Sequence, residues 1–153
     1  YMRTGDIGEY DSDGYLTITG RLKDQFKTDK GKYISPAPIE TRMLTNHFLE
    51  QVCIVGTGIP QPIALVTISD SGKMVHSNEL KLLLDKDRIA INSTLEKHEK
   101  IEKIVILNNH WTVENGLLTP SLKVKRNELE KIFLPHYSSW YQKQGSVIRD
   151  NAD

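Results

Sequence analysis

Residues 20–40 read GRLKDQFKTDKGKYISPAPIE, and this stretch carries more structural signals than any other part of the sequence. Asp29, Lys30 and Gly31 predict a sharp turn, because glycine adopts a positive φ at little steric cost. Residues 26–27 before the turn and 33–34 after it can pair as a short hairpin. Ser35 and Pro36 then predict a helix, with serine as the N-cap and proline at the first helical position.

The same stretch carries a local excess of positive charge in a chain whose 20 basic and 20 acidic residues balance. A run of charge is most often only a solvated surface, and on charge alone this is the more frequent explanation. Cations on an exposed hairpin also suit an anionic partner, with phosphate as the first candidate. The charged side chains of residues 20–32 are Arg21, Lys23, Lys27, Lys30 and Lys32 against Asp24 and Asp29.

Composition narrows the class of protein. A chain of 153 residues forms one domain, or one domain with a short appendage. Its zero net charge argues against a general nucleic-acid binder, which normally carries a basic excess. Cys53 is the single cysteine, so no disulfide forms within the chain, and we expect Cys53 to be a buried small side chain in a cytoplasmic protein. No apolar run approaches the ~18 residues that span a bilayer.

The remaining pattern predicts a small α+β domain. Paired strands are expected at 7–10 and 15–19, and an antiparallel pair at 52–55 and 63–68, with a further strand at 101–107. Helices are expected at 36–46, 77–84, 87–98, 126–133 and 137–144, with Ser77 as an N-cap. The fold class is thus a small mixed sheet of about three strands with helices packed on it, preceded by hairpins, and a poorly ordered tail from Gly145.

Three segments, in this order, support a more specific interpretation: Thr4-Gly5-Asp6, the stretch quoted above, and LTPSLKVKR at residues 118–126. Together they resemble the signatures of the adenylate-forming acyl-CoA synthetase superfamily. The long-chain fatty acid CoA ligases are the most similar branch, because GRLKDQFK, KGKY and PAPIE follow their pattern. Many members have glycine where this chain has Leu122.

The resemblance implies a role for each matched residue. It places Lys123 as the catalytic lysine that bridges the substrate carboxylate and the α-phosphate during adenylation, where an ammonium offsets the repulsion between two anions. It places Asp6 at the ribose hydroxyls of the adenylate and Arg21 at its ribose or phosphate. Lys23 falls at the hinge about which the C-terminal domain rotates. Gly31 and Lys27 belong to a hairpin that lines the CoA tunnel.

The chain is therefore expected to be a fragment of a larger enzyme. Residues 1–22 would end the preceding region, 23–144 would form the C-terminal lid domain, and 145–153 the tail. The parent reaction would convert a fatty acid, ATP and CoA into acyl-CoA, AMP and pyrophosphate. Mg²⁺ is expected for the whole enzyme but not as a ligand of this fragment. The expected partner is the N-terminal adenylation domain of the same chain, and peripheral association of the full enzyme with a membrane stays open.

Two alternatives remain. The parent could be an acyl-AMP ligase that loads a carrier protein, or the chain could be a non-catalytic module that binds a nucleotide or a partner. Retention of the lysine motif counts against the second alternative, because such a module would not need it. The pocket that sets acyl chain length would lie elsewhere, and the isolated chain is expected to have no synthetase activity.

Overall fold

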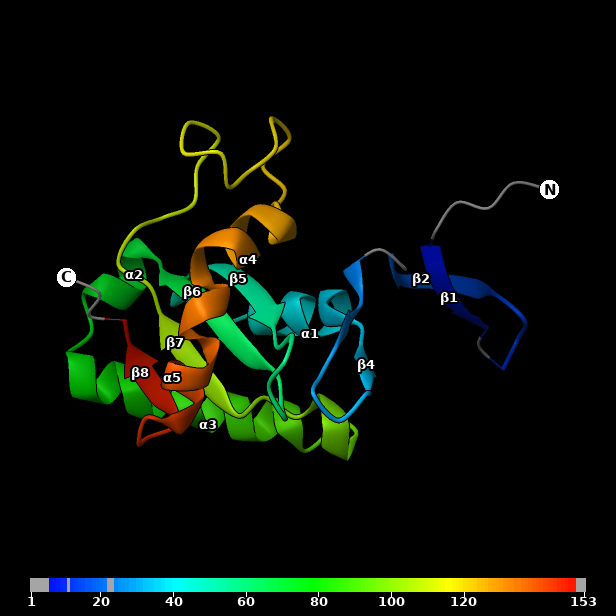
Figure 1. Ribbon diagram of the computed structural model, residues 1–153, viewed down its shortest axis with the longest axis horizontal. Helices are drawn as coiled ribbons and strands as arrows, with labels where there is room; N and C mark the ends of the chain where they lie inside the picture. Colours follow the sequence, from blue (N-terminus) through cyan, green and yellow to red (C-terminus); the bar gives the residue numbers. More distant parts are fainter. Residues whose placement is uncertain (1–5, 11, 22–23, 151–153) are drawn as a thin grey trace.

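The computed structural model describes residues 6–10, 12–21 and 24–150, and within these it contains two hairpins and one larger sheet. Strands β1 (Asp6–Tyr10) and β2 (Leu16–Arg21) form the first hairpin, which Figure 1 shows to one side of the main body. Strands β3 (Phe26–Lys27) and β4 (Tyr33–Ile34) form the second. Both hairpins were predicted from the sequence, and both are confirmed.

A four-stranded mixed sheet forms the centre of the domain. Its strands are β5 (Leu49–Val55), β6 (Ile63–Ile68), β7 (Lys103–Ile106) and β8 (Val147–Arg149), in that spatial order. β5 and β6 are antiparallel as predicted, whereas β7 and β8 continue the sheet in parallel with β6. Every residue of β6 is buried, because helices or loops cover both faces of the sheet.

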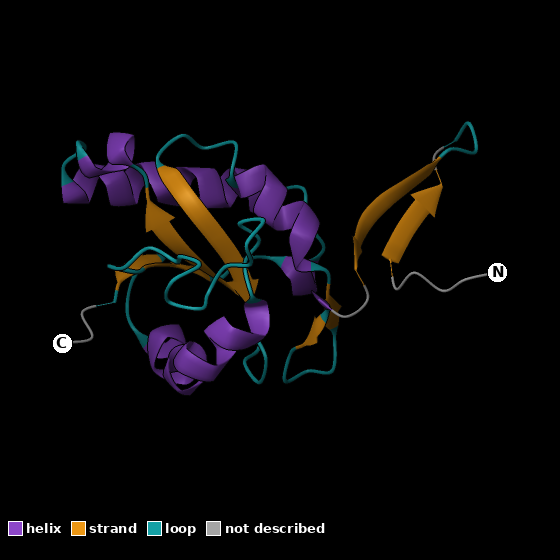
Figure 2. Cartoon of the chain, turned by 90° about the horizontal axis from the view of Figure 1, so that it is seen from above, coloured by secondary structure: helices purple, strands orange, loops and turns teal. Residues whose placement is uncertain are grey.

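Helices lie on opposite sides of the sheet (Figure 2). The faces alternate along each strand, so Ala64 and Val66 of β6 join one core while Ile63 and Leu65 join the other. The first core includes apolar residues of α1 (Pro36–Met43) and α3 (Ser77–Asn92). The second includes residues of α4 (Arg126–Phe133) and α5 (Tyr137–Gln142). Smaller elements are α2 (Asp70–Lys73) and the 3-10 helices Lys97–Glu99 and Leu134–His136.

The start of α1 differs from the expected cap. Ser35 occupies the N-cap position, but its hydroxyl caps no backbone N–H; instead it accepts a hydrogen bond from the Gln25 side chain at 2.9 Å. The helix also ends at Met43 and not near residue 46. Asn46 turns the chain there, because its side-chain oxygen accepts a hydrogen bond from the Phe48 N–H at 3.0 Å.

The two helices predicted at 77–84 and 87–98 are one continuous helix, α3, which ends at Asn92 and not near residue 98. The prediction was wrong because the polar residues between them suggested a break. In the structure Leu80, Leu84 and Ile91 share the face buried against the sheet, so the apolar stripe passes through the polar segment. Ser77 is not the N-cap either: His76 takes that position and its Nδ1 accepts from the Asn78 N–H.

The prediction of a poorly ordered tail is wrong at Val147–Arg149, which forms β8. Val147 and Ile148 are buried, one in each core. The buried Lys103 helps to hold the segment that precedes β8, because its ammonium donates to the carbonyls of Lys143 and Gly145. The sheet therefore has four strands and not about three. Within the described part of the chain, no helix is both long and apolar enough to cross a membrane.

Candidate functional site

Lys123 lies in a tight turn between two residues that pair across it. Leu118 and Val124 form an antiparallel bridge, and the Thr119 N–H donates to the Lys123 carbonyl at 2.8 Å. The Thr119 hydroxyl in turn accepts from the Lys123 N–H at 3.0 Å. These bonds fix the backbone of Lys123, while its side chain is exposed. The residue that the sequence singled out as catalytic is thus a cation presented at the surface by a hydrogen-bonded turn.

Leu122 has a strained backbone conformation in this turn. Its φ is +65°, and it is the one non-glycine residue with a positive φ among those that the structure describes. The left-handed region costs an L-residue roughly 1–2 kcal/mol, because Cβ crowds the following carbonyl oxygen. Glycine, which the resembled family often has here, would avoid that cost.

Leu122→Gly is therefore expected to raise the free energy of unfolding by about 0.5–1 kcal/mol, since the relief of strain exceeds the extra chain entropy of glycine. Little burial is lost, because 69% of Leu122 is exposed. Urea unfolding of the chain measures the change. Leu122→Ala is the matched control, because alanine keeps the strained φ; equal stabilities of the two variants would contradict this explanation.

Arg126, at the start of α4, fastens the lysine turn to the body of the domain. Its Nη2 donates to both carboxylate oxygens of Glu40, at 3.0 and 2.9 Å. Its Nη1 donates to the Ile54 carbonyl, and Glu40 accepts from the Ile54 N–H at 2.8 Å. Both charged side chains are about 15% exposed or less, so this pair is largely removed from water. The pair joins α1, β5 and α4 immediately beside Lys123.

Cys53 lies against the same pair and has no signs of reactivity. It is completely buried, and Arg126 Nη1 lies 3.1 Å from its sulfur. Burial raises the pKa of the Cys53 thiol to about 12, although the nearby Arg126 guanidinium acts in the opposite direction. The thiol therefore stays protonated at neutral pH, and the expectation of a buried small side chain is confirmed.

A cavity of about 580 Å³ adjoins the lysine turn. Lys123 and Thr119 line one part of it, and α1 lines another through Ala37 and Thr41. Asp24 also lines it, so a residue next to the predicted hinge position shares the cavity with the predicted catalytic lysine. The full lining consists of Asp24, Ala37, Glu40, Thr41, Leu44, Val52, Thr119, Lys123, Val124 and Arg126.

The β3–β4 hairpin holds the predicted CoA-tunnel residues. Gly31 has a φ of +79°, as its turn requires, and its N–H donates to the Thr28 carbonyl. The tip is held to the loop after β5, because the Asp29 N–H donates to the Ile59 carbonyl at 3.1 Å. The ammonium of Lys27 lies 5.8 Å from the centroid of the Tyr33 ring, a weak cation–π contact.

The remaining predicted residues are placed only in part. Asp6 and Arg21 are opposite each other in the register of the first hairpin, so the two residues expected at the adenylate are brought together by β1 and β2. Thr4, Gly5 and Lys23, the predicted hinge residue, lie outside the described residues. Figure 1 shows the segment between β7 and α4, which contains Lys123, and the β3–β4 hairpin at different ends of the domain.

Sequence reasoning missed the part played by Glu40. Glu40 is the last residue of the stretch 20–40, and its partner Arg126 is the last residue of the lysine motif at 118–126. The two are 86 positions apart in the sequence. The only local signal is a carboxylate beside the buried Ile39 on a short helix. Among the described residues no three His, Cys, Asp or Glu side chains form a group that could hold a metal ion. Mg²⁺ therefore stays an expectation for the whole enzyme.

The mixed sheet with helices on both sides is the fold of C-terminal domains of adenylate-forming enzymes. The family model for the AMP-binding enzyme C-terminal domain matches residues 23–145, so the chain belongs to this family, as the resemblance predicted.

Two curated relatives carry the likeness to fatty acid ligases. Long-chain-fatty-acid–CoA ligase FadD15 of Mycobacterium tuberculosis is 32% identical over 161 residues, covering 94% of this chain and 27% of the relative. Long-chain-fatty-acid–CoA ligase 5 of Mus musculus is 31% identical over 160 residues, covering 93% of this chain and 23% of the relative. The chain thus spans about a quarter of the length of these relatives.

Two solved structures carry the likeness of fold. The adenylation domain of a carboxylate reductase from Mycobacterium chelonae has a TM-score of 0.76 at 20% identity, covering 92% of this chain and 23% of that one. The anthranilate CoA ligase AuaEII, in complex with anthranoyl-AMP, has a TM-score of 0.62 at 19% identity, covering 84% and 23%. They confirm the α+β fold class.

Proposed function

We propose that this chain is the C-terminal domain of an AMP-forming fatty acyl-CoA ligase. In the first half-reaction a carboxylate oxygen of the fatty acid attacks the α-phosphorus of ATP, the bond from that phosphorus to the bridging oxygen breaks, and pyrophosphate leaves. In the second the CoA sulfur, having lost its proton, attacks the acyl carbon and AMP leaves. The placement of Lys123 on a fixed turn is the observation that carries the proposal.

Lys123 would supply the charge that adenylation needs. Two anions approach each other in that step, and a positioned ammonium stabilises the charge that gathers at phosphorus. The hydrogen bonds of Thr119 and the Arg126–Glu40 pair hold the backbone of the turn. Lys123 therefore loses less conformational entropy when it binds the substrate. Asp6 and Arg21 would bind the adenylate, with the carboxylate accepting from the ribose hydroxyls.

The β3–β4 hairpin would serve the second half-reaction. Figure 1 shows the turn of this hairpin and the loops between β7 and α4 on different sides of the domain, which supports a separate role for each. We infer that the domain rotates about Lys23 between the half-reactions. The N-terminal adenylation domain of the same chain is the partner against which it would rotate.

The direct test uses the full-length enzyme with a fatty acid, ATP and CoA. Formation of acyl-CoA with one AMP and one pyrophosphate is the expected result. Release of ADP, or no acyl transfer to either CoA or a carrier protein, would contradict the proposal. Transfer to a carrier protein in place of CoA would favour the alternative of an acyl-AMP ligase. The similarity to two CoA ligases supports CoA as the acceptor.

Gly31→Asn in the full-length enzyme is expected to slow thioester formation about tenfold and to leave adenylation unchanged, because the added side chain narrows the approach of CoA. Asparagine tolerates the positive φ of this turn, so the hairpin itself is kept. Single-turnover measurement of each half-reaction checks the split. Lys30→Asn at the same tip is the control, and a slower adenylation step in Gly31→Asn would contradict the assignment.

The isolated chain is expected to release no AMP from ATP and a fatty acid, because it spans about a quarter of the length of its relatives and the acyl pocket is expected to lie in the N-terminal adenylation domain. Chromatography of the nucleotides after incubation with the purified chain checks this. Steady AMP release that depends on the fatty acid would show that the domain holds both substrate sites.

A further inference from the structure

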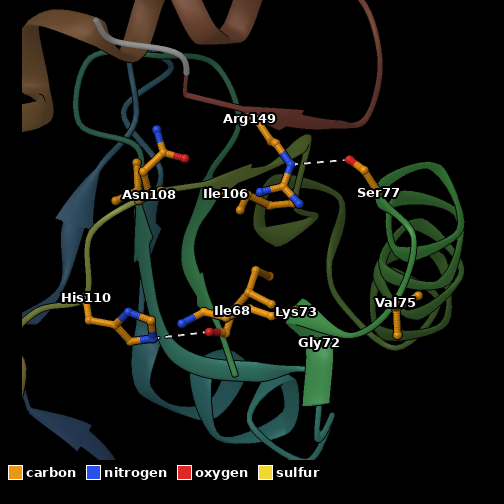
Figure 3. Close-up of a pocket in the computed structure, with 10 residues that line it drawn as sticks. Ile68, Gly72, Lys73, Val75, Ser77, Ile106, Asn108, His110 and Arg149 are labelled. Carbon is orange, nitrogen blue, oxygen red and sulfur yellow. Dashed lines mark hydrogen bonds between the residues drawn. The ribbon is translucent and has the colours of Figure 1, made fainter. Parts of the chain in front are cut away.

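A second cavity, unrelated to Lys123, lies where three parallel strands end (Figure 3). Ile68, Ile106 and Arg149 are the last residues of β6, β7 and β8, and all three line it. Its volume is about 320 Å³. Ligands of open α/β sheets bind at this carboxyl edge, because the strand ends and the helix that follows leave a crevice there.

Arg149 is the principal charged group of this cavity. Its Nε donates to the Ser77 hydroxyl at 3.4 Å, which is long for a hydrogen bond, and its terminal nitrogens have no hydrogen-bond partner among the residues that the structure describes. Among the described residues no carboxylate lies within ion-pair distance of it. The neighbouring Asp150 does not line this cavity; it lines an adjacent one, which shares Leu107, Asn108 and His110 with it. The guanidinium is therefore a cation whose charge is not offset within the described part of the protein.

Lys73 supplies a second cation at the same place. Among the described residues it pairs with Asp70 alone, at 3.9 Å, and the two side chains are 58% and 106% exposed. An exposed pair of this length contributes about 0–1 kcal/mol at most, so an incoming anion can compete for the ammonium.

The rest of the lining also favours an anion. None of the lining residues is acidic: they are Ile68, Gly72, Lys73, Val75, Ser77, Ile106, Leu107, Asn108, His110 and Arg149. His110 is held in place by a hydrogen bond between its Nε2 and the Ile68 carbonyl, which Figure 3 marks. The 16-residue helix α3 begins at Ser77, and its dipole adds to the positive potential of the two side chains.

We propose that this cavity binds a phosphate group, either as free phosphate or as the phosphate of a small monoester. Arg149 and Lys73 hold its oxygens, the Ser77 hydroxyl donates to one of them, and Val75 and Ile106 contact the body that carries it. None of these residues lines the cavity beside Lys123, so the site is separate from the one proposed for adenylation.

The test is a titration of the ¹⁵N-labelled chain with inorganic phosphate, at an ionic strength kept constant with sodium chloride. We expect saturable shifts of the amide resonances of residues 72–78 and 106–110. Arg149→Gln and Lys73→Gln should each weaken binding about tenfold, because each removes a charge-assisted hydrogen bond. Lys131→Gln, which removes an exposed lysine of α4, is the matched control and should bind like the parent chain.

A parallel titration with AMP separates the two sources of the phosphate. If AMP shifts the same resonances with a lower dissociation constant than phosphate, the ligand is a monoester. If phosphate shifts them and AMP does not, the ligand is the free anion. Shifts that do not saturate, shifts confined to the β3–β4 hairpin, or equal affinity in Arg149→Gln, Lys73→Gln and the parent chain would overturn the proposal.

Discussion

Lys123→Ala in the full-length enzyme is expected to slow acyl-adenylate formation by about a hundredfold to a thousandfold, the usual cost of removing a charge-stabilising group from a transition state. Thioester formation from supplied acyl-AMP should be kept, because the lysine would be turned away from the active site in that step. The side chain is exposed and contributes to neither core, so the fold should not change. Pyrophosphate exchange and single-turnover thioester formation measure the two steps.

Lys125→Ala is the matched control for this variant. Lys125 is also an exposed lysine, two positions further on, and it is not among the residues that line the cavity beside Lys123. It should leave both half-reactions near the parent rates. An equal loss of both half-reactions in Lys123→Ala, or an equal loss of adenylation in Lys125→Ala, would contradict the role proposed for Lys123.

The second large effect is expected on stability. Arg126→Ala should lower the free energy of unfolding by about 3–5 kcal/mol, because it leaves the largely buried carboxylate of Glu40 without its cation. The Ile54 carbonyl also loses a donor. Since a domain of this size has a total stability of about 5–15 kcal/mol, the loss would be clear in urea unfolding of the chain.

The double variant Arg126→Met with Glu40→Leu separates the charge from the packing. Removing both charges together leaves no unpaired buried charge, so this variant should recover part of the loss. The recovery is incomplete because the Ile54 N–H and carbonyl lose the partners that Glu40 and Arg126 provide. Lys131→Ala breaks an exposed pair with Glu128 and should change the free energy by no more than about 1 kcal/mol. A loss in Arg126→Ala no larger than that of Lys131→Ala would show that the buried pair does not hold the domain together.

Local signals in the sequence predicted the local elements well. The β3–β4 hairpin followed from a glycine turn between short apolar pairs, and α4 was predicted at 126–133, the bounds it has in the structure. Both depend on residues close together in the chain. The lysine turn was singled out for the same reason, since its motif is nine residues long.

The features that sequence reasoning missed depend on contacts between distant residues. β8 has only three residues. It forms a strand because it pairs with β7, and because the buried Lys103, about 40 positions earlier in the sequence, donates to the Gly145 carbonyl just before it. α3 continues through Asp85 because Leu84 and Ile91 both face the sheet, while Arg88 pairs with Asp85 at 2.8 Å. The Arg126–Glu40 pair has no local signal at either residue.

The central claim is that two separate parts of one small domain serve two half-reactions. Its most direct test measures both half-reaction rates in Lys123→Ala and Gly31→Asn, side by side in the full-length enzyme. We predict that the ratio of adenylation to thioester formation falls in Lys123→Ala and rises in Gly31→Asn. A change of this ratio in the same direction in both variants, or no change in either, would contradict the claim.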